Sequence, residues 1–128
     1  MNWNENTLNP RVVLGYYDAA PSLKSVEVHR VSLLRDGPTA EIVFDVDSFP
    51  ERPSPKWPLG ANTCQITIRA IGITEVDVSR WGTGVLGDLK IGSENGMVEI
   101  EFSGQGNFRF LCSHLDVASV SAHISGRA

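Results

Sequence analysis

The residues of this chain that most readily suggest chemistry are its three histidines. His29, His114 and His123 lie on three separate predicted elements, and none has a companion histidine or cysteine at the spacing of a metal site. A catalytic or metal-binding trio would need the fold to bring them together. An imidazole that faces solvent or is hydrogen-bonded in a core is the commoner outcome. The sequence therefore predicts no metal site and no cofactor.

Two serine–histidine pairs suggest a small hydrolase. Ser113 and His114 are neighbours in a predicted strand, so their side chains point to opposite faces. Ser121 and His123 share a face, but the sequence shows neither a nucleophile elbow nor an acidic partner for the histidine. We therefore predict no catalytic residues and no enzyme, with a hydrolase as the weaker alternative.

Acidic side chains alternate along two predicted strands. Glu41, Asp45 and Asp47 share one face of the first strand, and Glu99 and Glu101 share one face of the second. Glycosidases use two carboxyl groups roughly 5–10 Å apart. Acids on the solvent face of a strand more simply keep it soluble and discourage edge pairing. Of the two functional interpretations, docking of a basic partner on the first strand is favoured over catalysis.

A proline-rich loop over residues 49–58 leads into the next strand. Its prolines stiffen it and lower the entropy lost on binding, and Arg and Trp are enriched at interface hot spots. Trp57 could instead fold back and plug the end of the sheet. We predict a partner surface that includes Glu41, Asp45, Asp47, Arg52 and Trp57. The loop at residues 82–87 is the second choice.

The bulk composition is that of one ordinary globular domain. The chain has 128 residues, of which 41% are hydrophobic and 20% charged, and its formal net charge is −4. That charge argues against nucleic acid and anionic membranes, which both need clustered Lys and Arg. The start of the chain lacks a basic leader, and no apolar run approaches the roughly 20 residues of a membrane span. We expect a single cytoplasmic domain over residues 1–128, and the oligomeric state stays open.

The two cysteines, Cys64 and Cys112, each lie on the apolar phase of a strand pattern. They have no Cys-x-x-Cys spacing and no histidine at zinc-site distance. Free cysteine is among the most buried residue types. The sequence predicts buried, reduced thiols, with a disulfide as the minor alternative.

One helix is predicted, over residues 10–17. Asn9 can cap it, Pro10 suits its first position, and apolar residues follow at three- and four-residue spacing. Gly15 weakens the pattern, and Pro21 ends any continuation.

Period-two patterns dominate from residue 25 onward. The predicted strand segments are residues 25–34, 39–47, 63–73, 74–81, 89–91, 97–103, 108–113 and 117–125. Asp36-Gly37 and Asn95-Gly96 predict hairpins. A slip in the apolar phase predicts a bulge near His29-Arg30, and Gly72 marks a bend.

These elements predict a mainly β (α+β) fold. It would be an antiparallel curved sheet or a two-sheet sandwich of about seven or eight short strands, with one short N-terminal helix. Strand order is left open, as is the choice between one curved sheet and two packed sheets.

As a whole pattern, the chain resembles the immunity protein 50 family, small bacterial proteins associated with polymorphic-toxin systems. The resemblance covers most of the chain and lies in residues 21–23, 33–38, 45–50, 56–57, 62–65, 76–82 and 119–121. These are turn and packing residues rather than a catalytic signature. The resemblance implies an immunity protein that binds a cognate toxin domain. It does not identify the toxin, although a basic, nuclease-like domain would suit an acidic stripe.

The resulting functional prediction is toxin neutralisation by stoichiometric occlusion, which requires no catalytic group. The alternatives are a small-molecule-binding β-domain, in which the loop around Trp57 covers an apolar cavity, and a small hydrolase. A large toxin gene with a variable C-terminal domain next to this gene would favour the immunity function.

Overall fold

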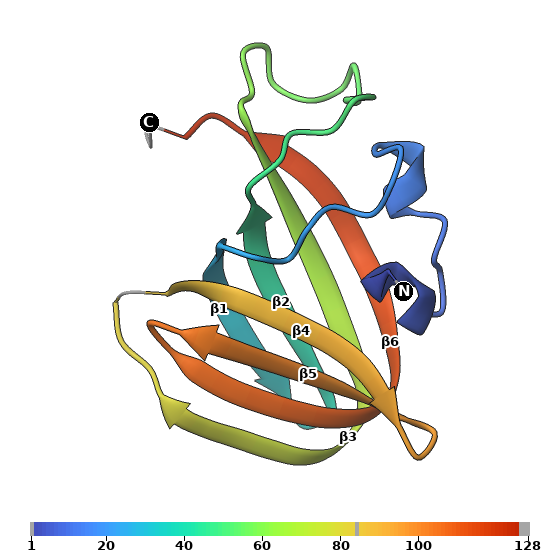
Figure 1. Cartoon of the computed structure of the whole chain (residues 1–128), viewed down its shortest axis with the longest axis vertical. Helices are drawn as coiled ribbons and strands as arrows, with labels where there is room; N and C mark the ends of the chain where they lie inside the picture. Colours follow the sequence, from blue (N-terminus) through green and yellow to red (C-terminus); the bar gives the residue numbers. More distant parts are fainter. Residues whose placement is uncertain (1, 84, 126–128) are drawn as a thin grey trace.

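The computed structural model describes residues 2–83 and 85–125, which form a closed antiparallel barrel (Figure 1). Around the barrel the strands run β1-β2-β3-β6-β5-β4. Within the described residues the elements are the 3₁₀ turns η1 (Trp3–Asn6) and η2 (Val13–Gly15) and the strands β1 (Val26–Leu34), β2 (Thr39–Val46), β3 (Thr63–Arg80), β4 (Leu86–Glu94), β5 (Met97–Gly104) and β6 (Asn107–His123). The mainly β, antiparallel prediction is confirmed.

The predicted seven or eight strands are not confirmed, because two long strands replace four short ones. β3 joins the predicted segments 63–73 and 74–81, and β6 joins 108–113 and 117–125. Gly72 has φ +70° and the β3/β6 register shifts just after it, so β3 bends without ending. Such irregularities increase local twist and allow a sheet to close. Figure 1 shows β3 and β6 curving through both halves of the barrel.

The predicted helix over residues 10–17 is wrong, since only the η2 turn forms there and no α-helix occurs among the described residues. Asn9 does not cap a helix. Its side-chain amide binds the backbone N and O of Val117 on β6, each at 2.9 Å. The guanidinium of Arg52 binds backbone carbonyls of the same segment. The Asn9 side chain and the backbone carbonyls that a helix would use are therefore hydrogen-bonded to residues far away in the sequence.

Local turn chemistry is as predicted. Asn95 (φ +52°) and Gly96 (φ +80°) form the tight β4–β5 turn, for which two positive φ angles are required. The β1/β2 register shifts between Val28 and Arg30, which confirms the predicted bulge. His29 is the residue left out of the register at this bulge.

Side chains fill the barrel interior. Its largest fully buried members are Phe44, Phe102 and Phe110, packed among branched aliphatic residues. Cys64 and Cys112 are fully buried and free, as predicted, and burial raises the pKa of the Cys112 thiol to about 11. In the described part of the chain, no helix has the length and apolar character needed to span a membrane.

Candidate functional site

A cluster of polar side chains surrounds the carboxylate of Asp45. The Nε2 atom of His29 lies 2.7 Å from Oδ2, and the Nε2 atom of His123 lies 3.1 Å from Oδ1. The amide of Gln65 donates to Oδ1 at 3.2 Å. Asp45 is only 2% exposed, whereas both imidazole side chains are more than one-third exposed. We call His29, Asp45 and His123 the Asp45 cluster.

Strand register brings this cluster together from three strands. Glu27 on β1, Asp45 on β2 and Gln65 on β3 lie in one cross-strand row. His123 lies near the end of β6, opposite the start of β3. The bulge on β1 frees His29 from the regular alternation, and bulges commonly redirect a side chain in this way. In the sequence, the slip in the apolar phase of β1 indicated the bulge at His29. No sequence pattern indicated that Asp45 and His123 would meet His29.

The cluster corrects two expectations. Asp45 was predicted on a solvent-facing strand face, but the side chains of neighbouring strands cover it. The histidines were expected to stay apart, yet His29 and His123 meet at Asp45, with ring centroids 6.2 Å apart. His114 stays exposed on β6 and outside the cluster.

Electrostatics around Asp45 favour its charged form. Burial alone would raise the pKa of Asp45, but the hydrogen bonds from His29, His123 and Gln65 outweigh burial and lower it. A buried carboxylate is therefore held as an anion by two imidazoles and an amide.

The cluster also supplies the acidic partner for His123 that the sequence lacked. A hydrolase would further require Ser121 to hydrogen-bond His123. In the described residues, Nε2 of His123 is directed to Asp45 and no hydrogen bond joins it to Ser121. Ser121 and His123 are therefore not joined as a nucleophile and its base in this geometry.

The remaining acidic residues of β2 differ in their surroundings. Glu41 lies opposite Arg69 on β3, and the Arg30 guanidinium lies 4.0 Å from the Glu41 carboxylate. Arg69 in turn forms a two-point ion pair with Asp116 on β6. Cross-strand pairs of opposite charge stabilise a sheet face. Asp47 follows β2 and is exposed. Of the three residues of the predicted acidic stripe, Asp45 is thus buried, Glu41 lies in a cross-strand row of opposite charges and Asp47 is exposed.

Arg52 and Trp57 tie the proline-rich loop to the N-terminal segment. The Nη2 atom of Arg52 donates to the carbonyls of Leu14 at 2.7 Å and Tyr17 at 2.8 Å. Trp57 is half-buried and stacks on Tyr16, with ring centroids 5.2 Å apart and an interplanar angle of 8°. These contacts match the interpretation of Trp57 as a residue that folds back. In Figure 1 this loop lies beyond the end of β2.

A second candidate surface lies where pairing in the closed barrel is incomplete, along one edge of β1 and one edge of β3. Among the described residues, β1 pairs with β4 through Val26 and Glu27 alone, and β2 pairs with β3 as far as Ile71. From Ile73 to Arg80, β3 pairs with β6. One backbone edge of each strand therefore continues beyond these pairs, and we call the region between these two edges the open seam.

Apolar side chains gather at the open seam. Val78 lies opposite the buried Phe108 in the β3/β6 register, so it belongs to the inner face of the barrel, yet it is 49% exposed. Trp81 and Leu33 are 50% and 57% exposed and line a hollow of about 190 Å³ with Val78 and Phe108. Val78 thus faces inward and is still not covered. The sequence could not show this, because the exposure of Val78 depends on how far along β3 the pairing with β2 reaches.

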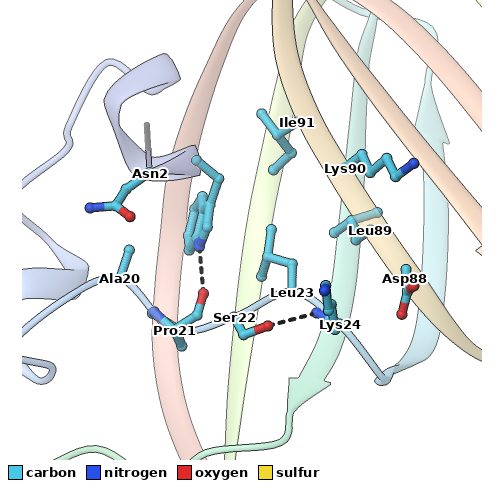
Figure 2. Close-up of a pocket in the computed structure, with 11 residues that line it drawn as sticks. Asn2, Ala20, Pro21, Ser22, Leu23, Lys24, Asp88, Leu89, Lys90 and Ile91 are labelled. Atoms are coloured by element: carbon cyan, nitrogen blue, oxygen red, sulfur yellow. Dashed lines mark hydrogen bonds between the residues drawn. The ribbon is translucent and has the colours of Figure 1, made fainter.

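A third hollow lies between the N-terminal segment and β4 (Figure 2). It measures about 300 Å³ and is lined by Pro21, Leu23, Leu89 and Ile91, with Trp3 donating its indole N–H to the Pro21 carbonyl at 2.8 Å. The hydrogen bonds drawn there join groups of the N-terminal segment to one another. This hollow is a packing gap beside β4 rather than a site with converging polar groups.

The family model described as Immunity protein 50 matches residues 9–123. The chain belongs to this family, which confirms the resemblance seen in the sequence. The family indicates an immunity protein, a class whose partner is a toxin. No curated protein and no solved structure matches the chain.

Proposed function

We propose that the protein neutralises a cognate bacterial toxin domain in the cytoplasm by binding it stoichiometrically and occluding its working surface. Membership of the Immunity protein 50 family supports this proposal. The observation that carries it is the open seam, where inner-face side chains of the barrel remain uncovered. Occlusion needs a complementary surface and no catalytic group.

The open seam has the composition of an interface core. Exposed apolar side chains are ordinary when scattered, but contiguous ones mark interaction sites. Trp81 is a residue type enriched among hot spots, and Val78 and Leu33 flank it around one hollow. Burying these half-exposed side chains under a toxin surface would remove their apolar area from water.

The strand edges beside the seam offer a second source of affinity. Beyond the bonds of Val28 to Val85 on β1 and of Ile73 to Pro38 on β3, each strand presents backbone N–H and C=O groups along one edge. An extended toxin segment can pair with such an edge, as in β-strand addition. Backbone pairing would set the register of the segment, and the apolar hollow would accept its side chains.

The acidic surface around Glu41 and Asp47 remains the alternative contact region. Its charges would accelerate encounter with a basic toxin and fix its orientation more than they would increase affinity. Asp45 contributes little there because it is buried. Arg52 and Trp57 would act chiefly by holding the loop in place.

The test uses the purified protein and the toxin domain encoded beside its gene. We expect wild type to bind one toxin and to protect cells that express it. Val78→Asp and Trp81→Ala should each weaken binding by about tenfold or more, mainly through faster dissociation. Leu59→Asp is the matched control, because Leu59 is an exposed aliphatic residue, 99% accessible, outside the seam.

Two results would overturn different parts of the proposal. Failure of the wild-type protein to bind or protect against this toxin would refute the neutralising function. If both seam variants are folded and bind like wild type, the seam is not the interface. Glu41→Lys/Asp47→Lys then tests the acidic surface, where slower association is expected.

A further inference from the structure

We propose that His29, Asp45 and His123 form a binding site for one divalent transition-metal ion of the zinc type. The three side chains are the Asp45 cluster, and their ligand atoms all lie within 4.8 Å of one another. This inference is independent of toxin binding and concerns residues other than those that line the hollow at the open seam.

The donor set suits such an ion. Imidazole nitrogen and carboxylate oxygen are ordinary ligands of zinc, and two histidines with one carboxylate recur in sites that keep a further position open. Both histidines direct Nε2 toward the same carboxylate, at 2.7 and 3.1 Å. The atoms that would coordinate the ion therefore already point to one place.

The spacing is close to that of a coordinated set. Ligands at about 2.0–2.1 Å from a tetrahedral zinc ion lie roughly 3.3 Å apart. The two hydrogen-bonded distances from Asp45 are slightly shorter, and the separations within the cluster reach no further than 4.8 Å. Small rotations of the two partly exposed imidazoles would open the space for the ion between them.

Charge favours occupation by a cation. Asp45 is almost fully buried, and the contacts of its carboxylate come from two imidazoles and the Gln65 amide rather than from Lys or Arg. A buried carboxylate is stabilised by a cation placed against it. A divalent ion supplies this charge while both imidazoles remain neutral ligands.

Access and a fourth ligand are also available. The side chains of His29 and His123 are 37% and 39% exposed, so an ion can reach them from solvent. The Oε2 atom of Glu27 lies 3.4 Å from Nε2 of His29, and both residues line a surface hollow of about 450 Å³. Glu27 or water would complete the coordination.

The experiment titrates zinc chloride into the full-length, chelator-treated protein by isothermal calorimetry. We expect one zinc ion per chain and a higher melting temperature with zinc. His29→Ala and His123→Ala should each weaken zinc affinity by about tenfold or more. His114→Ala is the matched control, because this exposed histidine on β6 lies outside the cluster, and it should bind like wild type.

Cobalt provides a second readout that does not depend on stability. Addition of Co²⁺ should give visible absorption bands of nitrogen- and oxygen-coordinated cobalt, and these bands should disappear in both cluster variants. Asp45 is buried, so an Asp45→Asn variant need not fold. The test therefore uses His29→Ala and His123→Ala, whose side chains are partly exposed. Absence of stoichiometric zinc binding, or equal affinity in wild type, His29→Ala and His123→Ala, would overturn the proposal.

Discussion

The N-terminal segment protects an edge of β6, and Asn9 is the residue on which this protection depends. β6 pairs with β5 from its start only as far as Cys112. Further along this strand, the N–H of Leu8 donates to the carbonyl of Leu115 at 2.7 Å, and the Asn9 amide binds both backbone groups of Val117. We predict that Asn9→Ala uncovers this edge.

The magnitude follows from the two lost hydrogen bonds. Each is 2.9 Å long, and Val117 is only 4% exposed. A hydrogen bond contributes about 1 kcal/mol net, and a buried group left without a partner costs about 1–3 kcal/mol. Because Asn9 itself is half-buried, water can partly replace its amide. We expect Asn9→Ala to lower the free energy of unfolding by about 2 kcal/mol.

Urea unfolding measures the total effect, and hydrogen exchange locates it. The Val117 amide should exchange faster in Asn9→Ala than in wild type. Asn9→Asp should be intermediate, because its carboxylate still accepts from the Val117 N–H but cannot donate to the carbonyl. Asn2→Ala is the control: Asn2 is exposed and its side chain makes no cap hydrogen bond.

The reasoning is refuted if Asn9→Ala unfolds within about 0.5 kcal/mol of wild type, the usual range of a surface substitution. Unchanged exchange of the Val117 amide would also refute it. In that case the apolar contacts of the segment, rather than the Asn9 amide, would hold it on β6.

Two further predictions concern the loop clamp and the buried thiol. Arg52→Ala should lower the free energy of unfolding by about 1 kcal/mol, a modest value because the side chain is 48% exposed. Arg52→Lys should not restore it, because a single ammonium can replace Nη2 at the Leu14 and Tyr17 carbonyls but cannot also supply Nη1 at Asp18 and Nε at the Gly15 carbonyl. Urea unfolding checks this, and full recovery in Arg52→Lys would contradict it. Burial keeps the Cys112 thiol neutral and raises its pKa from 9.0 to about 11. The stability that this shift contributes is fully present below pH 9.0 and is lost as pH rises toward about 11. The difference in unfolding free energy between wild type and Cys112→Ala should therefore shrink by roughly 2 kcal/mol between about pH 8 and pH 11, and a difference independent of pH would disprove the assignment.

Much of the β-structure could be predicted because its signals are local. Asn95-Gly96 specifies a tight turn, since these residue types tolerate the positive φ angles that the turn requires. The apolar phase slip on β1 located the bulge at His29, and strand periodicity placed Cys64 and Cys112 in the core. These features depend on backbone conformation or on which face of a strand is apolar.

The number of strands and the missing helix could not be read locally. A glycine such as Gly72 looks the same in sequence whether a strand ends there or bends, and only pairing with β6 shows that β3 continues. A helix over residues 10–17 had plausible local signals. It lost to long-range hydrogen bonds of Asn9 and Arg52, whose partners lie far away in sequence.

The candidate sites show the same division most clearly. The sequence by itself determined that the protein is an antiparallel β-domain of the Immunity protein 50 family, because turn residues and period-two patterns encode both. Only the tertiary structure decided that His29 and His123 meet at a buried Asp45, since that meeting requires the register of four strands. It also decided that Val78 is exposed on an inner face, because β2 begins at Thr39, opposite Ile71, and does not flank the later part of β3.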